Sequence, residues 1–458
     1  MPPQRPAPSA RFTPPSRVRA AAFGLLGTVA LVAFGLRIGD VAFVDEYAYI
    51  SQSYYADLFL TGEWNDPAWL DFPGYDLMPL PKYLIGTALR VSNEPRPGPA
   101  AARMWYANTH STFGTPRTLT SARVPSILVG GLGCLALAAI GAMAFDFRVG
   151  IAAGVLLMLN PLYALHAHRA MSEAPCEAFL MASLALALAA WRRSFAGRAS
   201  GFRILGLLAG AGVAAALAVL AKFNGLLALM TIAAWAGLAW AIPRGAGWGW
   251  LWFATGSALA AVTAGLAFMA LNPYMTARDP VYRVADPADA GPLRPGPLGA
   301  WGRFRLLIDH RRAMSAGQQR IFPHNALKRL PERAKVVAVQ GFGRFGPFGP
   351  ATSDSTIRYD MRQDRGAFAW LPLCLGAMGY AMAYGRMQSR RREPPAAWAV
   401  AAWALVSLTV VTLYLPMAWD RYLLPIQAPF SLLAAAAIVG AWDALARLAG
   451  WKPRLEPS

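Results

Sequence analysis

Long apolar runs separated by shorter polar links extend along most of the chain, from about residue 20 to residue 446. Most runs are close to the roughly 20 residues that a helix needs to cross the hydrocarbon core of a bilayer. The runs lie at about 20–38, 119–145, 149–165, 174–191, 204–221, 224–242, 251–271, 366–384, 396–415 and 422–446. This pattern predicts an all-α polytopic membrane protein with about ten transmembrane helices.

Two of the polar segments are long, 39–118 after the first run and 272–365 after the seventh. They divide the chain into three parts. The first is a transmembrane core at 20–271, which includes the first loop, the second is the long loop 272–365, and the third is a set of C-terminal transmembrane helices at 366–446. Within the first loop, 79–91 is apolar but too short to span. It is predicted to lie at the membrane interface or to dip into the protein.

Basic residues mark one side of the predicted membrane. They gather in the links after every second run and in the two terminal tails, 1–19 and 447–458. The tail at 1–19 is rich in Pro and is predicted to be disordered. The basic links hold Arg148, Arg192, Arg193, Arg198, Arg203, Arg244, Arg386, Arg390, Arg391 and Arg392. The positive-inside rule then predicts cytoplasmic termini, with both long loops on the outer face of the membrane. The composition, rich in Arg, Ala and Pro, and the absence of sorting signals favour a bacterial inner membrane, whose outer face is periplasmic.

Composition agrees with a membrane location. Hydrophobic residues make up 56% of the chain and charged residues 15%, whereas soluble domains carry about 25% charged residues. The net charge of +19 can indicate a nucleic-acid partner, but the basic links form no nucleic-acid-binding motif, so none is expected. The three cysteines, Cys134, Cys176 and Cys374, form no CxxC pair, so neither disulfides nor a thiolate zinc site is expected.

The first candidate site follows the first run, where Asp45 and Glu46 are adjacent in the sequence VDEYAY. Two carboxylates at the end of a span can simply be solvated. They can equally supply a general base or ligands for a divalent cation. The aromatic residues that follow, beginning with Tyr47, suit a short amphipathic helix on the membrane surface.

The second candidate site is the link HAHRAMSE between the third and fourth runs. Glu173 is either a helix-start residue favoured by the helix dipole or the second carboxylate of an active site. His166 and His168 are two positions apart, which places them on different faces of a helix, so a histidine metal site is not favoured.

Two cations complete the set on the predicted outer face. Lys222, in AKFNG, either snorkels to the interface or provides a point charge for a phosphate. Arg421, in MAWDRYLLP, can pair with Asp420 or fork onto phosphate oxygens, while Trp419 and Tyr422 suit an interfacial aromatic belt. Carboxylates and cations on one side of one membrane suit chemistry on an anionic lipid head group.

The order of these segments resembles that of a known superfamily. VDEYAY follows the first run, MPLPKYLIG precedes the short apolar segment, ARVPSILVGGL opens the second run, and HAHRAMSE, AKFNG and DRYLLPI follow in turn. This ordered set is similar to the GT-C superfamily of integral membrane glycosyltransferases, in particular to the branch of protein O-mannosyltransferases and lipid A aminoarabinose transferases. The similarity covers about 20–271 and, more weakly, 422–446.

The resemblance implies a GT-C fold and a glycosyltransferase that uses a polyprenyl-phosphate sugar donor at the outer membrane face, with 20–271 as the catalytic core. Asp45 would match the base of the family, with Glu46 beside it, and Glu173 its second acidic position. Lys222 and Arg421 would match the basic positions that bind the donor phosphate.

Further candidates for substrate binding are Tyr47, Lys82, Arg169 and Tyr422. The chain departs from the family pattern in two places. Lys82 follows Pro79-Leu80-Pro81, where the family often has a Lys before a Pro-Pro pair, and Glu173 replaces the commoner Asp. The segment 272–365 matches no part of the family and is expected to bear on acceptor choice.

The resulting hypothesis is an inverting displacement, in which Asp45 takes a proton from a hydroxyl or amine of a lipid, glycan or protein acceptor. A divalent cation, Mg²⁺ or Mn²⁺, is an open alternative, with Asp45, Glu46 and Glu173 as its ligands. Two other classes stay open. A transporter or lipid flippase predicts ionisable residues deep within spans and repeated halves, and a non-catalytic assembly factor needs no acidic pair.

Overall fold

The computed structural model describes residues 15–99, 116–195, 200–242, 249–277, 299–344, 367–391 and 393–450. These ranges form helices joined by loops, and they contain one isolated β-bridge, Ala326 to Met417, but no β-strand. The predicted all-α fold class is therefore confirmed.

Eight helices in the described ranges are long and apolar enough to cross a membrane. They are α1 (Ser16–Gly35), α7 (Pro116–Ala144), α10 (Glu173–Phe195), α11 (Gly201–Ala221), α12 (Leu226–Ala241), α13 (Gly249–Ala270), α18 (Ala396–Tyr414) and α19 (Leu424–Leu448). Helix α17 (Ala367–Arg390) is 24 residues long but is not among these eight. The chain is thus a multi-pass membrane protein, and eight of the predicted spans correspond to single helices that are long and apolar enough to cross a membrane.

The run predicted as one span at 149–165 is instead broken. Helices α8 (Phe147–Leu159) and α9 (Pro161–Ala167) meet at a bend of 71°, as in a broken span or a re-entrant loop. Pro161 has no N–H to continue the ladder of α8. The Asn160 side chain instead caps α9 by accepting hydrogen bonds from the backbone N–H groups of Leu162 and Tyr163.

The ends of the chain differ slightly from the prediction. Helix α1 begins at Ser16, directly after Pro15, so the last part of the predicted 1–19 tail is helical. The segments 1–14 and 451–458 lie outside the described residues, and α19 extends to Leu448.

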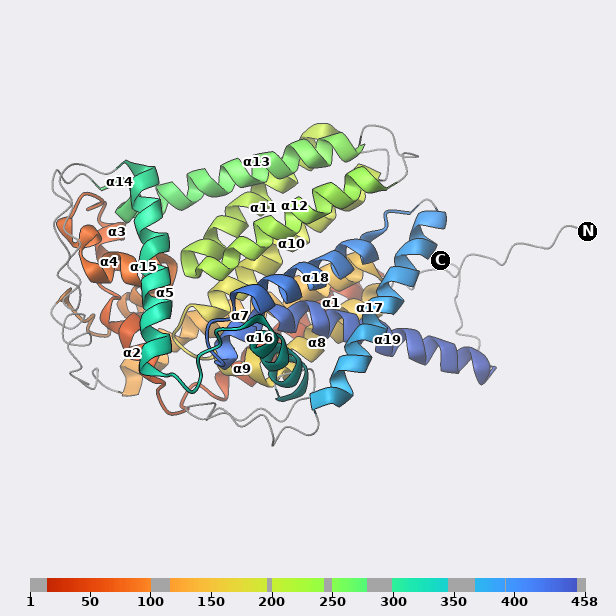
Figure 1. Cartoon of the computed structure of the whole chain (residues 1–458), viewed down its shortest axis with the longest axis horizontal. Coiled ribbons are helices and arrows are strands. Elements are labelled where there is room, and N and C mark those ends of the chain that lie inside the picture. The colour runs from red at the N-terminus through yellow and green to blue at the C-terminus, as the bar shows by residue number, and fades with distance from the viewer. Residues whose placement is uncertain are drawn as a thin grey trace, which may run out of the picture.

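Figure 1 shows the long helices lying side by side in one bundle, with most of the short helices gathered at one end. That end carries α2 (Val44–Ser51), α3 (Tyr55–Leu60), η1 (Pro67–Leu70), α4 (Phe72–Asp76), α5 (Pro79–Val91) and α14 (Pro273–Thr276). Helix α15 (Ala300–Ile321) lies across the same end, crosswise to the long helices. Three other short elements are η2 (Phe223–Gly225), α16 (Leu330–Val336) and η3 (Val337–Arg344).

The short apolar segment 79–91 forms α5, and part of this helix is buried in the protein at the end of the bundle. Gly86 permits this packing, because a Cβ atom there would lie 2.2 Å from the Ser53 carbonyl oxygen and 2.4 Å from the Ala56 Cβ. Small residues also allow the long helices to approach closely, as membrane helices commonly do. A Cβ on Gly212 of α11 would lie 2.3 Å from the Ala260 carbonyl oxygen of α13.

Of the second predicted loop, 272–365, the described part consists of α14, α15, α16 and η3. The segments 278–298 and 345–366 lie outside the described residues. Helix α15 joins α14 through Arg303, whose guanidinium donates to the carbonyl oxygen of Tyr274 at 2.7 Å. Helices α14 and α15 of this loop therefore lie at the end of the bundle where the short helices gather (Figure 1).

Candidate active site

Asp45 and Arg421 form an ion pair at the end of the bundle that carries the short helices. Asp45 lies in the first turn of α2, and Arg421 in η5 (Asp420–Leu423), directly before α19. Their side chains are 27% and 18% exposed, so the pair can be reached from outside. The Arg421 guanidinium also lies over the Trp419 ring, 4.7 Å from its centroid. The residue predicted as base thus contacts a residue predicted to bind phosphate.

A second ion pair joins Glu173 and Lys222, with 2.8 Å between carboxylate oxygen and Nζ. Glu173 begins α10 and is buried, whereas Lys222, directly after α11, is 22% exposed. The centroid of the Tyr422 ring lies near both cations, 5.6 Å from Lys222 Nζ and 5.8 Å from the Arg421 guanidinium carbon. The two ion pairs are therefore neighbours in a single cluster.

Tyr49 links α2 to this cluster. Its hydroxyl donates to Ser172 Oγ at 2.8 Å, and Ser172 Oγ donates to Glu173 at 3.1 Å. Burial raises the pKa of Tyr49 above its usual value, so the phenol stays protonated and keeps donating. Sequence reasoning missed Tyr49 and Ser172. The available signal was that Tyr49 lies one helical turn after Asp45, on the same face of α2.

Glu46 faces away from this cluster although it follows Asp45 directly. Its carboxylate is fully buried against Arg123 of α7, with contacts of 2.6 and 2.8 Å. The backbone N–H groups of Phe43 and Ala170 also donate to it, each at 2.8 Å. Arg123 in turn donates to the carbonyl oxygens of the loop before α2. This arrangement indicates that Glu46 joins α2 to α7 and to the link before α10 that contains Ala170.

Sequence reasoning also missed Arg123, which has 0% side-chain exposure. An arginine near the start of an apolar run was the available signal, because an ionised group there requires a partner.

The remaining predicted substrate-binding residues lie in different surroundings. Lys82 is fully buried, and its ammonium donates to the carbonyl oxygens of Pro73 at 2.6 Å and Gly74 at 3.1 Å. Burial lowers the pKa of Lys82 well below its usual value. The guanidinium of Arg169 lies over the Phe43 ring at 4.3 Å. Tyr47 is half-buried on α2, and Tyr422 lies within the cluster.

His166 of α9 is buried beside the cluster, and neither ring nitrogen has a hydrogen-bond partner within the described part of the chain. It interacts electrostatically with Asp420, Glu173, Arg169 and Lys222. His168 is also buried, but it has partners. Its Nδ1 lies 2.8 Å from the Ala164 carbonyl oxygen and its Nε2 lies 3.3 Å from Asp40.

Helix α15 adds a histidine and an arginine near the cluster. His310 Nε2 lies 3.1 Å from the Asp76 carboxylate, and Arg311 lies 3.9 Å from the same oxygen. The His310 ring also meets the rings of Phe72 and Tyr75 edge-on. Arg311 interacts electrostatically with Tyr49, so the crosswise helix borders the candidate site.

The three carboxylates considered as metal ligands do not fit a divalent cation. Such an ion requires several oxygen ligands converging on one point. Instead, Asp45 pairs with Arg421, Glu173 with Lys222, and Glu46 with Arg123. Throughout the described ranges, no three His, Cys, Asp or Glu side chains lie close enough to hold a metal ion.

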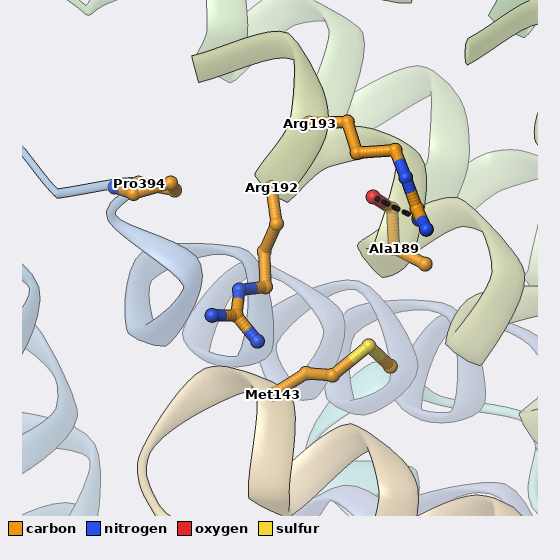
Figure 2. A pocket seen from close by; sticks show the side chains of 5 residues that line it. All are labelled: Met143, Ala189, Arg192, Arg193 and Pro394. Carbon is orange, nitrogen blue, oxygen red and sulfur yellow. Dashed lines mark hydrogen bonds between the residues drawn. The ribbon is translucent and has the colours of Figure 1, made fainter. Parts of the chain in front are cut away.

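The opposite ends of α7 and α10 carry a separate pocket of about 460 Å³. Figure 2 shows its lining residues, Met143, Ala189, Arg192, Arg193 and Pro394. Arg193 donates to the Ala189 carbonyl oxygen at 3.3 Å (Figure 2). This pocket contains none of the predicted site residues.

The fold of the chain is similar to that of two membrane glycosyltransferases. ArnT from Cupriavidus metallidurans, in a crystal structure bound to undecaprenyl phosphate, aligns with a TM-score of 0.51 at 15% identity, covering 94% of this chain and 64% of ArnT. The archaeal oligosaccharyltransferase AglB from Archaeoglobus fulgidus, in complex with an inhibitory peptide and a dolichol-phosphate, aligns with a TM-score of 0.50 at 14% identity, covering 97% of this chain and 53% of AglB.

This chain thus spans less than two thirds of the length of either protein. No protein-family model and no curated protein sequence matches it. Both structural neighbours belong to the GT-C superfamily, so the fold implied by the sequence resemblance is confirmed.

Proposed function

We propose that the protein is a glycosyltransferase that moves a sugar from a polyprenyl-phosphate donor to a lipid, glycan or protein acceptor. The observation that carries this proposal is the meeting of two ion pairs, Asp45 with Arg421 and Glu173 with Lys222, at one end of a GT-C fold. One site then contains both a carboxylate to accept a proton and two cations to hold a phosphate. The ligands of the structural neighbours, undecaprenyl phosphate in ArnT and a dolichol-phosphate in AglB, support a lipid-phosphate donor.

The reaction is an inverting displacement. The acceptor oxygen or nitrogen forms a bond to the anomeric carbon while Asp45 takes the acceptor proton. The bond from the anomeric carbon to the phosphate oxygen breaks, and its electron pair leaves with the polyprenyl phosphate. Arg421 and Lys222 stabilise the charge that develops on this leaving group. No metal ion is needed to balance the step.

The Asp45–Arg421 pair connects donor binding to this chemistry. A guanidinium can fork onto two phosphate oxygens, so the donor phosphate competes with Asp45 for Arg421. When the phosphate takes the guanidinium, Asp45 becomes available to accept a proton. The donor therefore activates its own base.

Glu173 acts as a positioning residue. Its buried carboxylate holds the Lys222 ammonium at 2.8 Å, and Ser172 and Tyr49 hold the carboxylate in turn. This chain of contacts fixes the lysine charge beside Arg421 before the donor arrives. A fixed charge stabilises a leaving group better than one that must reorient during reaction.

The proposed location is the outer face of the inner membrane, with both termini cytoplasmic. The asymmetry of basic links supports this orientation. Consistent with it, Arg148 and Asp443, which form an ion pair at 2.8 Å, lie in a link and a helix end that the prediction places in the cytoplasm. A periplasmic site would act on acceptors already exported from the cell.

The test is sugar transfer by the purified protein in detergent, with a panel of radiolabelled polyprenyl-phosphate sugars. Wild type should release label from at least one donor, and Asp45→Asn should not. Asp57→Asn is a matched control, because Asp57 is 32% exposed on α3 and also pairs with an arginine, Arg96, at 2.5 Å. This control should keep wild-type activity. If the wild-type protein neither turns over nor binds any donor, the proposal is overturned and the transporter hypothesis is favoured.

A further inference from the structure

His166 is a buried histidine whose hydrogen-bonding groups are unsatisfied within the described residues. It lies in α9 and is 2% exposed, and within the described residues neither Nδ1 nor Nε2 has a hydrogen-bond partner. A neutral imidazole has one N–H donor and one acceptor nitrogen. A buried donor or acceptor without a partner loses its hydrogen bonds to water and gains none in return, which destabilises the folded protein. A stable protein retains such a residue only where something else depends on it.

The polar side chains around His166 are paired. Tyr49 donates to Ser172, Ser172 to Glu173, and Lys222 to the same carboxylate. The contrast within the same segment is clear, because His168 lies within hydrogen-bonding reach of the Ala164 carbonyl oxygen. His166 therefore differs from these neighbours, because both of its ring nitrogens lack a hydrogen-bond partner within the described residues.

The charges near His166 indicate which ligand would satisfy it. It interacts electrostatically with two carboxylates, Asp420 and Glu173, and with two cations, Arg169 and Lys222, and of these Glu173 and Lys222 form one of the two ion pairs of the site. Lys222 and Arg421 interact electrostatically with each other, and both lie near the Tyr422 ring. An anionic group held by these two cations would lie near the imidazole, whose N–H can donate to an anionic oxygen. Hydrogen bonds to charged groups are among the stronger ones in proteins.

We propose that His166 is a donor-binding residue, whose ring N–H donates a hydrogen bond to a phosphate oxygen of the polyprenyl-phosphate donor. This inference rests on the proposed function, because it takes the same lipid phosphate as its ligand. It adds a third binding group to Lys222 and Arg421, contributed by the broken span α8–α9 rather than by α11 or η5. Helix α9 carries His166 and follows the 71° bend between α8 and α9.

The test compares His166→Phe with His168→Phe, using undecaprenyl phosphate without a sugar as the probe. Binding affinity is measured in detergent, together with the melting temperature of the ligand-free protein. Phe resembles imidazole in shape but cannot form hydrogen bonds. His166→Phe should therefore keep or raise the melting temperature, because it removes an unsatisfied polar group, and should weaken probe binding about tenfold to a hundredfold. His168→Phe should show the reverse, a lower melting temperature and unchanged binding.

Three results would overturn the inference, and they are distinguishable from one another. If wild type binds the probe and His166→Phe binds it equally well, His166 is not a donor-binding residue. If His166→Phe melts as early as His168→Phe, the histidine is structural and satisfied by a trapped water. If wild type does not bind the probe, the proposed function fails together with the inference.

His166→Asn is a second variant in case Phe does not fit. It keeps an N–H donor at this position and should retain more probe affinity than His166→Ala, measured alongside it. Equal affinities of Asn and Ala variants would count against a hydrogen bond to phosphate.

Discussion

The carboxylate of Asp45 contacts the guanidinium of Arg421, although the two residues belong to opposite ends of the chain. Asp45 is in the helix that follows the first span, and Arg421 directly precedes the last one. The contact brings together the residue proposed as proton acceptor and a residue proposed to bind the donor phosphate. In the proposed mechanism, a donor phosphate that binds Arg421 would release Asp45 to act as the base.

Replacing Asp45 with Asn should separate chemistry from binding. Loss of a general base lowers turnover by about a hundredfold or more. Donor affinity should stay the same or increase, because Arg421 no longer has a competing carboxylate. Turnover and equilibrium binding of undecaprenyl phosphate, measured on the same preparation, check both statements. Full turnover by the Asn variant would rule out Asp45 as the base.

The Glu173–Lys222 pair should behave as a coupled unit. Lys222→Met leaves a buried carboxylate without its cation, and breaking a buried pair typically costs about 3–5 kcal/mol. It should also weaken binding of the lipid phosphate. The double variant Glu173→Gln/Lys222→Met should recover part of the stability but none of the binding. Thermal unfolding and lipid-phosphate binding of the two single variants and the double variant form the required cycle. Additive stability effects would contradict the coupling.

Glu46 should matter for stability rather than for catalysis. Arg123→Met leaves the Glu46 carboxylate buried and uncompensated, which should cost about 3–5 kcal/mol and lower the melting temperature strongly. Asp45→Asn is the comparison, because its partly exposed ion pair is worth only about 0–1 kcal/mol. Activity per folded molecule should survive in Glu46→Gln, which keeps the shape of the side chain. A Glu46→Gln variant that folds normally but has lost turnover would show that Glu46 takes part in the reaction.

Chelators should leave sugar transfer unchanged. All three candidate carboxylate ligands are paired with arginine or lysine, and the described residues offer no cluster of three metal-binding side chains. The measurement is transfer activity after dialysis against EDTA, followed by return of Mg²⁺ or Mn²⁺. Loss of activity that either ion restores would show that the carboxylates rearrange around a cation during the reaction.

The free energy of unfolding should decrease as the pH is lowered from about 6.5 to about 4, because of His168. Burial lowers the pKa of His168 to about 4, and this effect outweighs the attraction of Asp40. The unfolded chain binds a proton below about pH 6.5, whereas the folded protein resists protonation until pH is near 4. The unfolded state therefore holds more protons in this window, and stability decreases as pH falls. The stabilisation is fully present above the window.

Melting temperatures at pH 7 and pH 5 test this statement. The difference should shrink in His168→Phe, which has no proton to bind. An equal difference in wild type and His168→Phe would assign the pH dependence to other groups.

The order of the helices could be read from the sequence, because each span needs about 20 apolar residues to satisfy its backbone within a bilayer. The same pattern placed Asp45, Glu173, Lys222 and Arg421 at span ends, because charged groups avoid the hydrocarbon core. Even the short helix α5 was visible as an apolar segment that is too short to span.

Only the tertiary structure decided what each of these groups contacts. Asp45 and Glu46 are neighbours in sequence, but successive residues of a helix point in different directions, so one meets Arg421 and the other Arg123. Lys82, which sequence order suggested as a substrate ligand, is buried against the Pro73 and Gly74 carbonyl oxygens. Arg421 and Arg123 come from segments distant in sequence, and their positions depend on how the helices pack, which local patterns do not encode.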